Sequence, residues 1–242
     1  MGLRMLQGRY LSVLEAKTAD NFKREIIGFA ESLGFTIVNA AAVIDHSLTH
    51  TEFLGVNNVP SNYQAIYDDE RLASVDPVMQ HCKRTAIPIA WDQNTYLEHD
   101  QGEKWEHQAQ FGYKAGIALA LHLPGNKHFL IGINGDRPLP SKYKKLTSIL
   151  ADMQLFSVHA QEAAFNIFLP QAHGFDERNI LTPRELECIR WTMDGYTAAD
   201  IGERLNISER TAVFHLQNAM KKLSCRSKYQ AVLKAMRLGL LT

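Results

Sequence analysis

Residues 181–240 read LTPRELECIRWTMDGYTAADIGERLNISERTAVFHLQNAMKKLSCRSKYQAVLKAMRLGL, and this stretch decides the fold of the last quarter of the chain. Thr182 stands before Pro183, and Glu185 follows three residues after Thr182. A threonine with a glutamate three residues later forms a capping box, and proline is favoured at the first helical position. The sequence therefore predicts a helix that begins here and ends near Gly195, because glycine commonly terminates helices.

Two further short helices are expected after this one, joined by a tight turn. Thr197 is placed to cap the first of them, Asn206 to end it, and Ser208 to cap the second. Such a pair is typical of a helix-turn-helix, whose second helix enters a DNA groove. The spacing of apolar residues predicts that the inner face of this second helix consists of Val213, Leu216, Met220 and Leu223.

Basic residues accumulate in and after the second helix. The whole chain has 26 basic and 26 acidic residues, so this is a local surplus on a neutral protein. A solvated helix face is the alternative explanation of a charge run, but caps, turn and charge together favour contact with DNA phosphates. Against one acidic residue, Glu209, residues 208–237 hold Arg210, Lys221, Lys222, Arg226, Lys228, Lys234 and Arg237.

This segment resembles the DNA-binding domain of LuxR-type regulators, the GerE-like helix-turn-helix family. The residues that carry the resemblance are Leu181, Thr182, Arg184, Glu185, Glu187, Trp191, Gly195, Ala199, Ile201, Leu205, Ser208, Thr211, His215, Asn218, Lys222 and Leu223. The resemblance implies base-edge contacts for one set of residues and phosphate contacts for another. The first set is Arg210, Val213 and Gln217, and the second is Thr211, Lys221 and Lys222.

Length and composition favour two domains. The chain has 242 residues, of which 45% are hydrophobic, enough to bury a core in each domain. Pro170 ends a helical pattern, and the polar segment after it contains Gly174. We expect a first domain at residues 1–170, a linker at 171–175 and a second domain at 176–242.

The compartment follows from cysteines and from apolar runs. No run approaches the roughly 20 residues of a membrane span, and the first residues lack the apolar stretch of a signal peptide. Cys82, Cys188 and Cys225 are scattered and odd in number, which argues against disulfides. We expect a cytoplasmic protein.

The first domain mixes helical and extended patterns, which predicts an α+β fold. We expect an N-terminal α/β/α sandwich on a mainly antiparallel sheet, followed by an all-α domain of four helices with the helix-turn-helix. The residues after 141 favour one long helix or two consecutive ones. The expected helices are 18–33, 60–70, 76–84 and 141–169, and the expected strands are 35–44, 50–56, 115–123 and 128–134, the last two forming a hairpin.

Aromatic and acidic residues gather in the middle of this domain. Tyr63 and Tyr67 are four residues apart and so share a helical face. Asp76 stands just before Pro77, where a helix cap is expected. Each of these residues also has an ordinary structural explanation. Asp76 would cap a helix, and the two tyrosines and Trp91 would belong to the hydrophobic core.

The order of these residues, however, resembles the autoinducer-binding domain of the same LuxR-type regulators over nearly all of residues 5–170. The matching positions are Tyr63, Tyr67, Asp76, Pro77, Trp91 and Gly116. The resemblance implies a pocket for an N-acyl homoserine lactone, which offers an amide N–H, two carbonyl oxygens and an apolar tail. The hypothesis requires residues 59–132 to enclose a cavity with the Asp76 carboxylate turned inward.

The resemblance also implies roles for single residues. Asp76 would accept the amide N–H of the ligand, Tyr67 would pack along the head group, and Trp91 would close over the lactone ring. A buried carboxylate is costly unless it is hydrogen-bonded, which the helix N-terminus after Pro77 could supply. Val78, Trp105 and Gly132 would line the acyl channel.

Two positions depart from the family pattern. Tyr63 stands where the family usually has tryptophan, whose indole N–H donates to the lactone carbonyl. Val59 removes a tyrosine hydroxyl that some members use on the acyl carbonyl. A modified lactone or another small apolar amide therefore stays open as the ligand.

Metal and catalytic chemistry are not expected. Six histidines match no zinc spacing, and no cysteine pair accompanies them: His46, His50, His81, His107, His122 and His128. The chain has no nucleophile motif, phosphate-binding glycine loop or paired catalytic carboxylates. We expect no metal, no cofactor other than the signal molecule, and no enzymatic activity.

The sequence thus predicts a ligand-responsive transcription regulator of quorum sensing. It would bind palindromic double-stranded DNA as a homodimer, with RNA polymerase as a candidate partner. An anti-activator that sequesters related regulators in heterodimers is one alternative. Control by phosphorylation is another, although the acidic residues of the first forty lie on expected helices and not at the strand ends that a receiver domain needs: Glu15, Asp20, Glu25 and Glu31.

Overall fold

The computed structural model describes residues 8–47, 50–61, 63, 74–169 and 180–241. The chain divides into two compact units, one formed largely by residues up to Pro170 and the other from Gln171 onward. None of the described helices combines the length and the apolar character that a bilayer-spanning segment needs.

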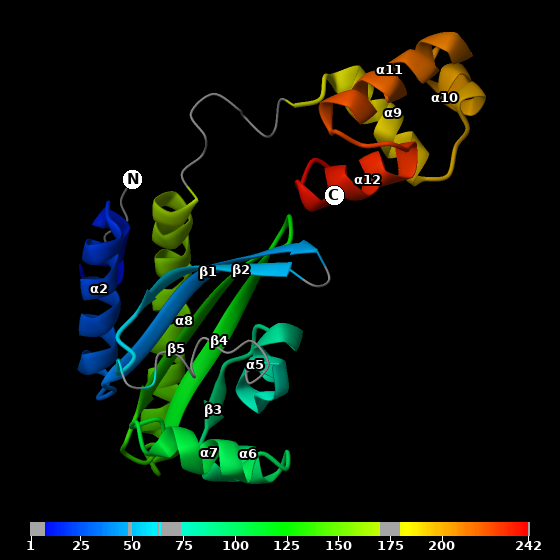
Figure 1. Ribbon diagram of the computed structural model, residues 1–242. Coiled ribbons are helices and arrows are strands. Elements are labelled where there is room, and N and C mark those ends of the chain that lie inside the picture. The colour runs from blue at the N-terminus through cyan, green and yellow to red at the C-terminus, as the bar shows by residue number, and fades with distance from the viewer. Residues whose placement is uncertain (1–7, 48–49, 62, 64–73, 170–179, 242) are drawn as a thin grey trace. The chain divides into compact units, whose positions relative to one another are not determined.

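A five-stranded antiparallel sheet forms the centre of the first unit (Figure 1). Its spatial order is β2-β1-β5-β4-β3. Residues that face each other across antiparallel strands point to the same side, so alternate residues decide what each face holds. The strands are β1 (Ile37–Ser47), β2 (His50–Asn57), β3 (Ile89–Trp91), β4 (Ala115–Leu123) and β5 (Lys127–Gly135).

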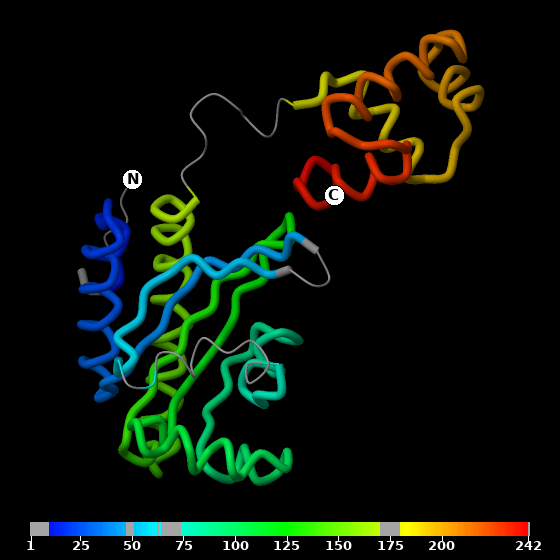
Figure 2. Tube along the Cα trace, viewed as in Figure 1, coloured from blue at the N-terminus to red at the C-terminus, as the bar shows by residue number. Residues whose placement is uncertain are grey.

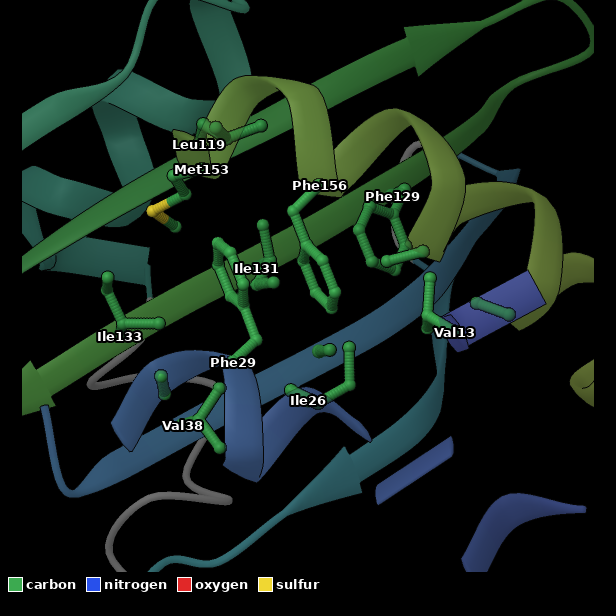
Figure 3. Close-up of a cluster of buried hydrophobic side chains, with 14 of the residues drawn as sticks. Val13, Ile26, Phe29, Val38, Leu119, Phe129, Ile131, Ile133, Met153 and Phe156 are labelled. Atoms are coloured by element: carbon green, nitrogen blue, oxygen red, sulfur yellow. The ribbon is translucent and has the colours of Figure 1, made fainter. Parts of the chain in front are cut away.

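One face of the sheet is covered by two long helices, with a short helical segment beside them. These elements are α1 (Gly8–Leu11), the 3-10 helix η1 (Ser12–Glu15), α2 (Ala19–Ser32) and α8 (Tyr143–Phe168). The larger apolar core lies between them and the sheet, and Figure 3 shows its centre. There the rings of Phe29 on α2 and Phe156 on α8 stack with centroids 3.8 Å apart. Ile131 and Ile133 of β5 complete this core from the sheet side.

In the described part of the chain, three short helices cover the opposite face: α5 (Pro77–Arg84), α6 (Gln93–Leu97) and α7 (Gly102–Ala109). A second, smaller apolar cluster lies on this side. Asp76 caps α5, and Pro77 occupies the first helical position as expected. Helices on both faces of an antiparallel sheet confirm the predicted α/β/α sandwich.

The expected elements of the first unit have counterparts with shifted ends. The residues after 141 form one helix, α8, instead of two. Gly125 and Asn126 turn the hairpin between β4 and β5 with positive φ angles of 79° and 57°. The helix expected at residues 60–70, with Tyr67, falls almost entirely outside the described residues.

Residues 180–241 of the second unit contain four helices, and Figure 2 traces their path: α9 (Pro183–Met193), α10 (Ala198–Leu205), α11 (Glu209–Lys222) and α12 (Lys228–Arg237). Thr182 and Glu185 form the predicted capping box. Thr197 and Ser208 cap α10 and α11, and Asn206 ends α10 in the left-handed conformation with φ 55°. The predicted helix-turn-helix is therefore confirmed by its cap and turn geometry.

The predicted inner face of α11 is partly wrong. Val213 is 36% exposed, whereas the buried residues of this helix are Ala212, Leu216 and Ala219. Both stripes fit a period of 3.6 residues and share Leu216, so spacing alone does not separate them. The alanines are buried because their small side chains let α11 approach α9 and α10 closely.

Candidate functional site

A cavity of about 790 Å³ lies between the sheet and the helices α5, α6 and α7. This volume is within the roughly 300–1,000 Å³ range of small-molecule sites. The apolar part of its wall consists of Ala40, Ala41, Phe53, Val56, Val78, Met79, Ala118, Leu130 and Ile131. The structure thus contains a cavity of the expected kind, although residues 39–57 of β1 and β2 line it together with the expected residues 59–132.

Most of the predicted ligand-binding residues meet in this cavity. Its wall includes Tyr63, Asp76, Val78, Trp91 and Gly132. Tyr67 lies outside the described residues.

Trp105 is not among the residues that line this cavity. Its indole Nε1 donates to the carbonyl oxygen of Lys114 at 3.0 Å. This bond holds the ring against the segment before β4, a pairing that its position on α7 alone could not reveal.

The Asp76 carboxylate is buried, with 8% of the residue exposed, and both of its oxygens have partners. Oδ1 accepts from the backbone N–H groups of Val78 at 2.9 Å and Met79 at 3.1 Å. Oδ2 accepts from the Tyr96 hydroxyl at 3.1 Å and forms an ion pair with Lys104 Nζ at 2.7 Å. A ligand N–H must therefore share Oδ2 with these two groups or replace one of them.

Sequence reasoning missed Tyr96 and Lys104. They stand 20 and 28 residues after Asp76, and only the folded chain brings α6 and α7 to the start of α5. A lysine on the cavity side of a short helix carries no signal in the sequence, since such side chains are usually solvated.

Two buried tyrosines border the carboxylate. Burial and the negative charge of Asp76 raise the pKa of Tyr63 to about 12. Burial, again with the charge of Asp76, also raises the pKa of Tyr96. Both phenols are protonated at neutral pH and can act as hydrogen-bond donors.

Aromatic rings form one end of the cavity wall. The Tyr63 ring stacks on Phe111 with centroids 4.7 Å apart and lies 5.3 Å from Tyr113. Trp91 meets Tyr96 edge to face at 5.7 Å. This arrangement places flat apolar surfaces beside the polar Asp76, which suits a small ring with polar substituents.

Two glycines of the sheet leave room for side chains that line the cavity. A Cβ at Gly116 would lie 2.6 Å from Asn134 Oδ1 and 2.8 Å from Trp91 Nε1. A Cβ at Gly132 would lie 2.7 Å from Asn39 Oδ1. Larger residues at these two positions would displace the asparagine and tryptophan side chains that cross the sheet here.

A second polar cluster lies where β1, β4 and β5 meet. His122 and His128 contact through their Nδ1 atoms at 2.9 Å, and His128 Nε2 lies 3.0 Å from Asp45 Oδ2. Burial would raise the pKa of Asp45, but hydrogen bonds from Thr51 and His128 outweigh it and hold this pKa below 3.8. Within the described part of the chain, no three histidine, cysteine or acidic residues are placed to hold a metal ion.

The outer face of α11 presents the residues expected to meet DNA bases. Arg210, Val213 and Gln217 are exposed, as is Lys221 further along. Phe214 is also exposed, at 56%, which the sequence reasoning did not single out. Thr211 is half-buried, and its hydroxyl contacts that of Ser208 at 2.8 Å.

Lys222 has a partner inside its own domain. Its Nζ lies 2.7 Å from Oε2 of Glu185, a side chain that is almost fully buried. Glu185 also accepts from the Thr182 backbone N–H at 2.8 Å. The ion pair joins the start of α9 to the end of α11, so phosphate contact by Lys222 stays a prediction that competes with this bond.

Comparison with known proteins covers both units. The autoinducer binding domain family matches residues 18–164, and the family described as bacterial regulatory proteins, luxR family, matches residues 179–235. The chain belongs to the LuxR family. Its members are transcription regulators, and this chain has their two domains in the same order.

Individual LuxR-family proteins match over most of their length. The transcriptional activator protein AnoR of Acinetobacter nosocomialis is 29% identical over 94% of this chain and 95% of its own. The quorum sensing-dependent regulator RpaR of Rhodopseudomonas palustris is 32% identical over 87% of this chain and 84% of its own. The fold is that of SdiA in complex with octanoyl-rac-glycerol, with a TM-score of 0.77, 23% identity, and coverage of 99% of this chain and 98% of that one.

Proposed function

We propose that this LuxR-family regulator senses an N-acyl homoserine lactone, which binds in the 790 Å³ cavity and controls DNA binding. The observation that carries the proposal is the buried Asp76 carboxylate in the wall of a cavity that also has an apolar part. A relative that is named as quorum sensing-dependent supports the same signal class.

The acyl tail of such a ligand suits the apolar part of the cavity wall, and the head group suits the polar part around Asp76. The acyl tail would lie against Phe53, Val56, Val78 and Leu130, where each buried methylene contributes about 0.8 kcal/mol. The head group would lie at Asp76 between the aromatic rings, with its amide N–H on Oδ2. Anything that binds only the folded state also stabilises that state.

For DNA, we propose a homodimer that places two α11 helices on a palindromic site about one helical turn apart. Arg210 and Gln217 would donate to base edges, and Val213 would make apolar contact there. Thr211 and the lysines at the end of α11 would hold phosphates. Such a regulator would act in the cytoplasm, with RNA polymerase as its candidate partner.

Thermal unfolding of the purified chain with N-octanoyl homoserine lactone tests the ligand half. The unfolding temperature should rise with ligand concentration, by the equivalent of about 2.7 kcal/mol at a hundredfold excess over Kd. An unfolding temperature that stays constant up to ligand saturation would count against a lactone site.

Mobility shift with a duplex selected from random sequences tests the DNA half. Gln217→Ala should weaken binding to the selected site while the dimer stays folded. Direct binding by the wild type would also separate this function from that of an anti-activator, and the exposed Arg210 and Gln217 favour direct binding.

A monoacylglycerol is the second candidate ligand. It is favoured by the asparagines in the cavity wall, Asn39, Asn57 and Asn134, which offer more hydrogen-bonding groups than a lactone needs. A competition between octanoyl homoserine lactone and octanoylglycerol, which share the same acyl length, decides between the two.

A further inference from the structure

Gln108 on α7 is a buried polar residue that the proposed lactone contacts leave unexplained. It is 5% exposed and lines the cavity. Its Nε2 is buried and makes no hydrogen bond of acceptable geometry to any residue that the structure describes. Buried donors nearly always have an acceptor, because an unpaired one loses its bonds to water without replacement.

The surroundings of Gln108 place it at the polar end of the cavity. Its amide is close enough to the Tyr96 hydroxyl to oppose the rise in the pKa of that group. Tyr96 in turn donates to Asp76 Oδ2 at 3.1 Å. Lys104, four residues earlier on α7, pairs with the same oxygen at 2.7 Å, and residues four apart share a helical face. Gln108 is thus next to the carboxylate assigned to the ligand amide.

We propose that Gln108 determines specificity for the head group by donating its amide N–H to a neutral carbonyl oxygen of the ligand. The inference rests on the proposed function, and for an acyl homoserine lactone this oxygen is the ring carbonyl. That carbonyl is bonded to the ring carbon that carries the amide nitrogen. An amide N–H at Asp76 therefore brings the ring carbonyl toward the residues next to Asp76.

The charges in the cavity wall favour a neutral acceptor over a carboxylate. The wall carries Asp76, Asp100 and Glu103 against the single ammonium of Lys104, which is already paired with Asp76. A ligand carboxylate beside Gln108 would meet this surplus of negative charge, whereas a carbonyl dipole would not. An amide is a suitable donor here because it is neutral at every relevant pH.

The test compares two probes that differ in the ring alone. N-octanoyl homoserine lactone and N-cyclopentyl octanamide have the same chain and the same amide, but the second has no ring carbonyl. Both are titrated by calorimetry into the full chain, as wild type, Gln108→Met and Gln110→Met. Gln110 is the matched control, since it is the exposed glutamine that caps the C-terminus of the same helix.

We expect Gln108→Met to lower lactone affinity about 10-fold and to change cyclopentyl amide affinity by no more than about 2-fold. Gln110→Met should bind both probes as the wild type does. Gln108→Glu, which keeps the shape but presents an acceptor to the carbonyl, should lose lactone affinity in the same selective way. It replaces Gln108→Met if circular dichroism shows that the latter does not fold.

Equal losses for both probes would overturn the inference and leave Gln108 with a packing role only. Unchanged lactone affinity in Gln108→Met would overturn it as well. In either case the wild type still binds the lactone, so the proposed function survives. If the wild type binds neither probe, the lactone proposal fails and this inference falls with it.

Discussion

The two carboxylate oxygens of Asp76 bind different kinds of partner. Oδ1 caps α5 through two backbone N–H groups, and Oδ2 takes the Tyr96 hydroxyl and the Lys104 ammonium. Asparagine keeps a side-chain oxygen for the cap but loses the charge. The structural and the ligand-binding roles of this residue can therefore be separated by one substitution.

We expect Asp76→Asn to raise the ligand concentration for half-maximal response by about 10-fold or more, the cost of losing a charged hydrogen bond. A reporter assay over a lactone series measures this. Asp92→Asn is the control, because Asp92 caps α6 through its side chain in the same way and does not line the cavity. An equal response of wild type and Asp76→Asn would remove Asp76 from the site.

Glu185 couples the stability of the second unit to pH. Burial would raise its pKa, but hydrogen bonds from Lys222 and Thr182 outweigh burial and hold the pKa below 4.5. A carboxylate whose pKa is lowered by folding stabilises the protein above its unfolded pKa. That contribution is lost as the pH falls below 4.5 and through the folded pKa.

Glu185→Gln should therefore destabilise the second unit at about pH 7, and the difference from the wild type should shrink as the pH falls below 4.5 and through the folded pKa. Urea unfolding followed by amide signals of α9 and α11 measures both values. Glu187→Gln serves as the control, since Glu187 forms an exposed ion pair with Arg184. A gap between wild type and Glu185→Gln that is independent of pH would contradict the assignment.

At the scale of elements, the turn between α10 and α11 depends on a close backbone approach. A Cβ at Gly202 would lie 2.9 Å from the Ile207 carbonyl oxygen and 3.1 Å from the Glu209 nitrogen. These atoms belong to the turn and to the first residue of α11, so they cannot move without changing the angle between the helices. Gly202 is thus required by packing, although glycine is a poor helix former.

We expect Gly202→Ala to destabilise the second unit by about 1–3 kcal/mol and to weaken DNA binding. Gly28→Ala on α2 should have the opposite sign, a gain of about 0.5–1 kcal/mol. Gly28 is an exposed helical glycine with nothing within 4 Å of its Cβ position. Thermal unfolding compares the two variants. Destabilisation by Gly28→Ala as well would contradict the explanation, because at that position only helix propensity should change.

At the scale of the whole molecule, charge is distributed unevenly between the two units. Basic and acidic residues are equal in number over the chain, but α11 and α12 are strongly basic. A neutral protein with one basic face gains DNA affinity from released counterions, and this gain depends on salt. Residues that touch phosphate and residues that read bases should therefore respond differently to salt.

Lys221→Ala should reduce the slope of log K against log salt concentration by about 1, whereas Gln217→Ala should weaken binding and leave the slope unchanged. Fluorescence anisotropy with a selected duplex over a salt series measures both quantities. Lys144→Ala, which removes an exposed lysine from α8, is the control. A wild-type slope in Lys221→Ala would exclude its phosphate contact.

Many helix ends, turns and strands of this protein could be predicted from the sequence, because they depend on local interactions. Helix caps and turns involve residues that are close in the sequence, so they can be predicted from it. The residues that form them in the second unit are Thr182 with Glu185, Thr197, Asn206 and Ser208. Asp76 before Pro77 predicted the start of α5 for the same reason. The alternation of apolar residues likewise marked the strands and the sandwich, since each pattern depends on residues a few positions apart.

Only the tertiary structure decided which residues that are far apart in the sequence come into contact. The partners of Asp76 come from α6 and α7, Trp105 donates to Lys114 instead of lining the cavity, and Gln108 is buried at its polar end. The burial of Ala212 in place of Val213 depends on how closely α11 packs against α9 and α10. Such contacts are set by packing between elements, and no local spacing rule encodes them.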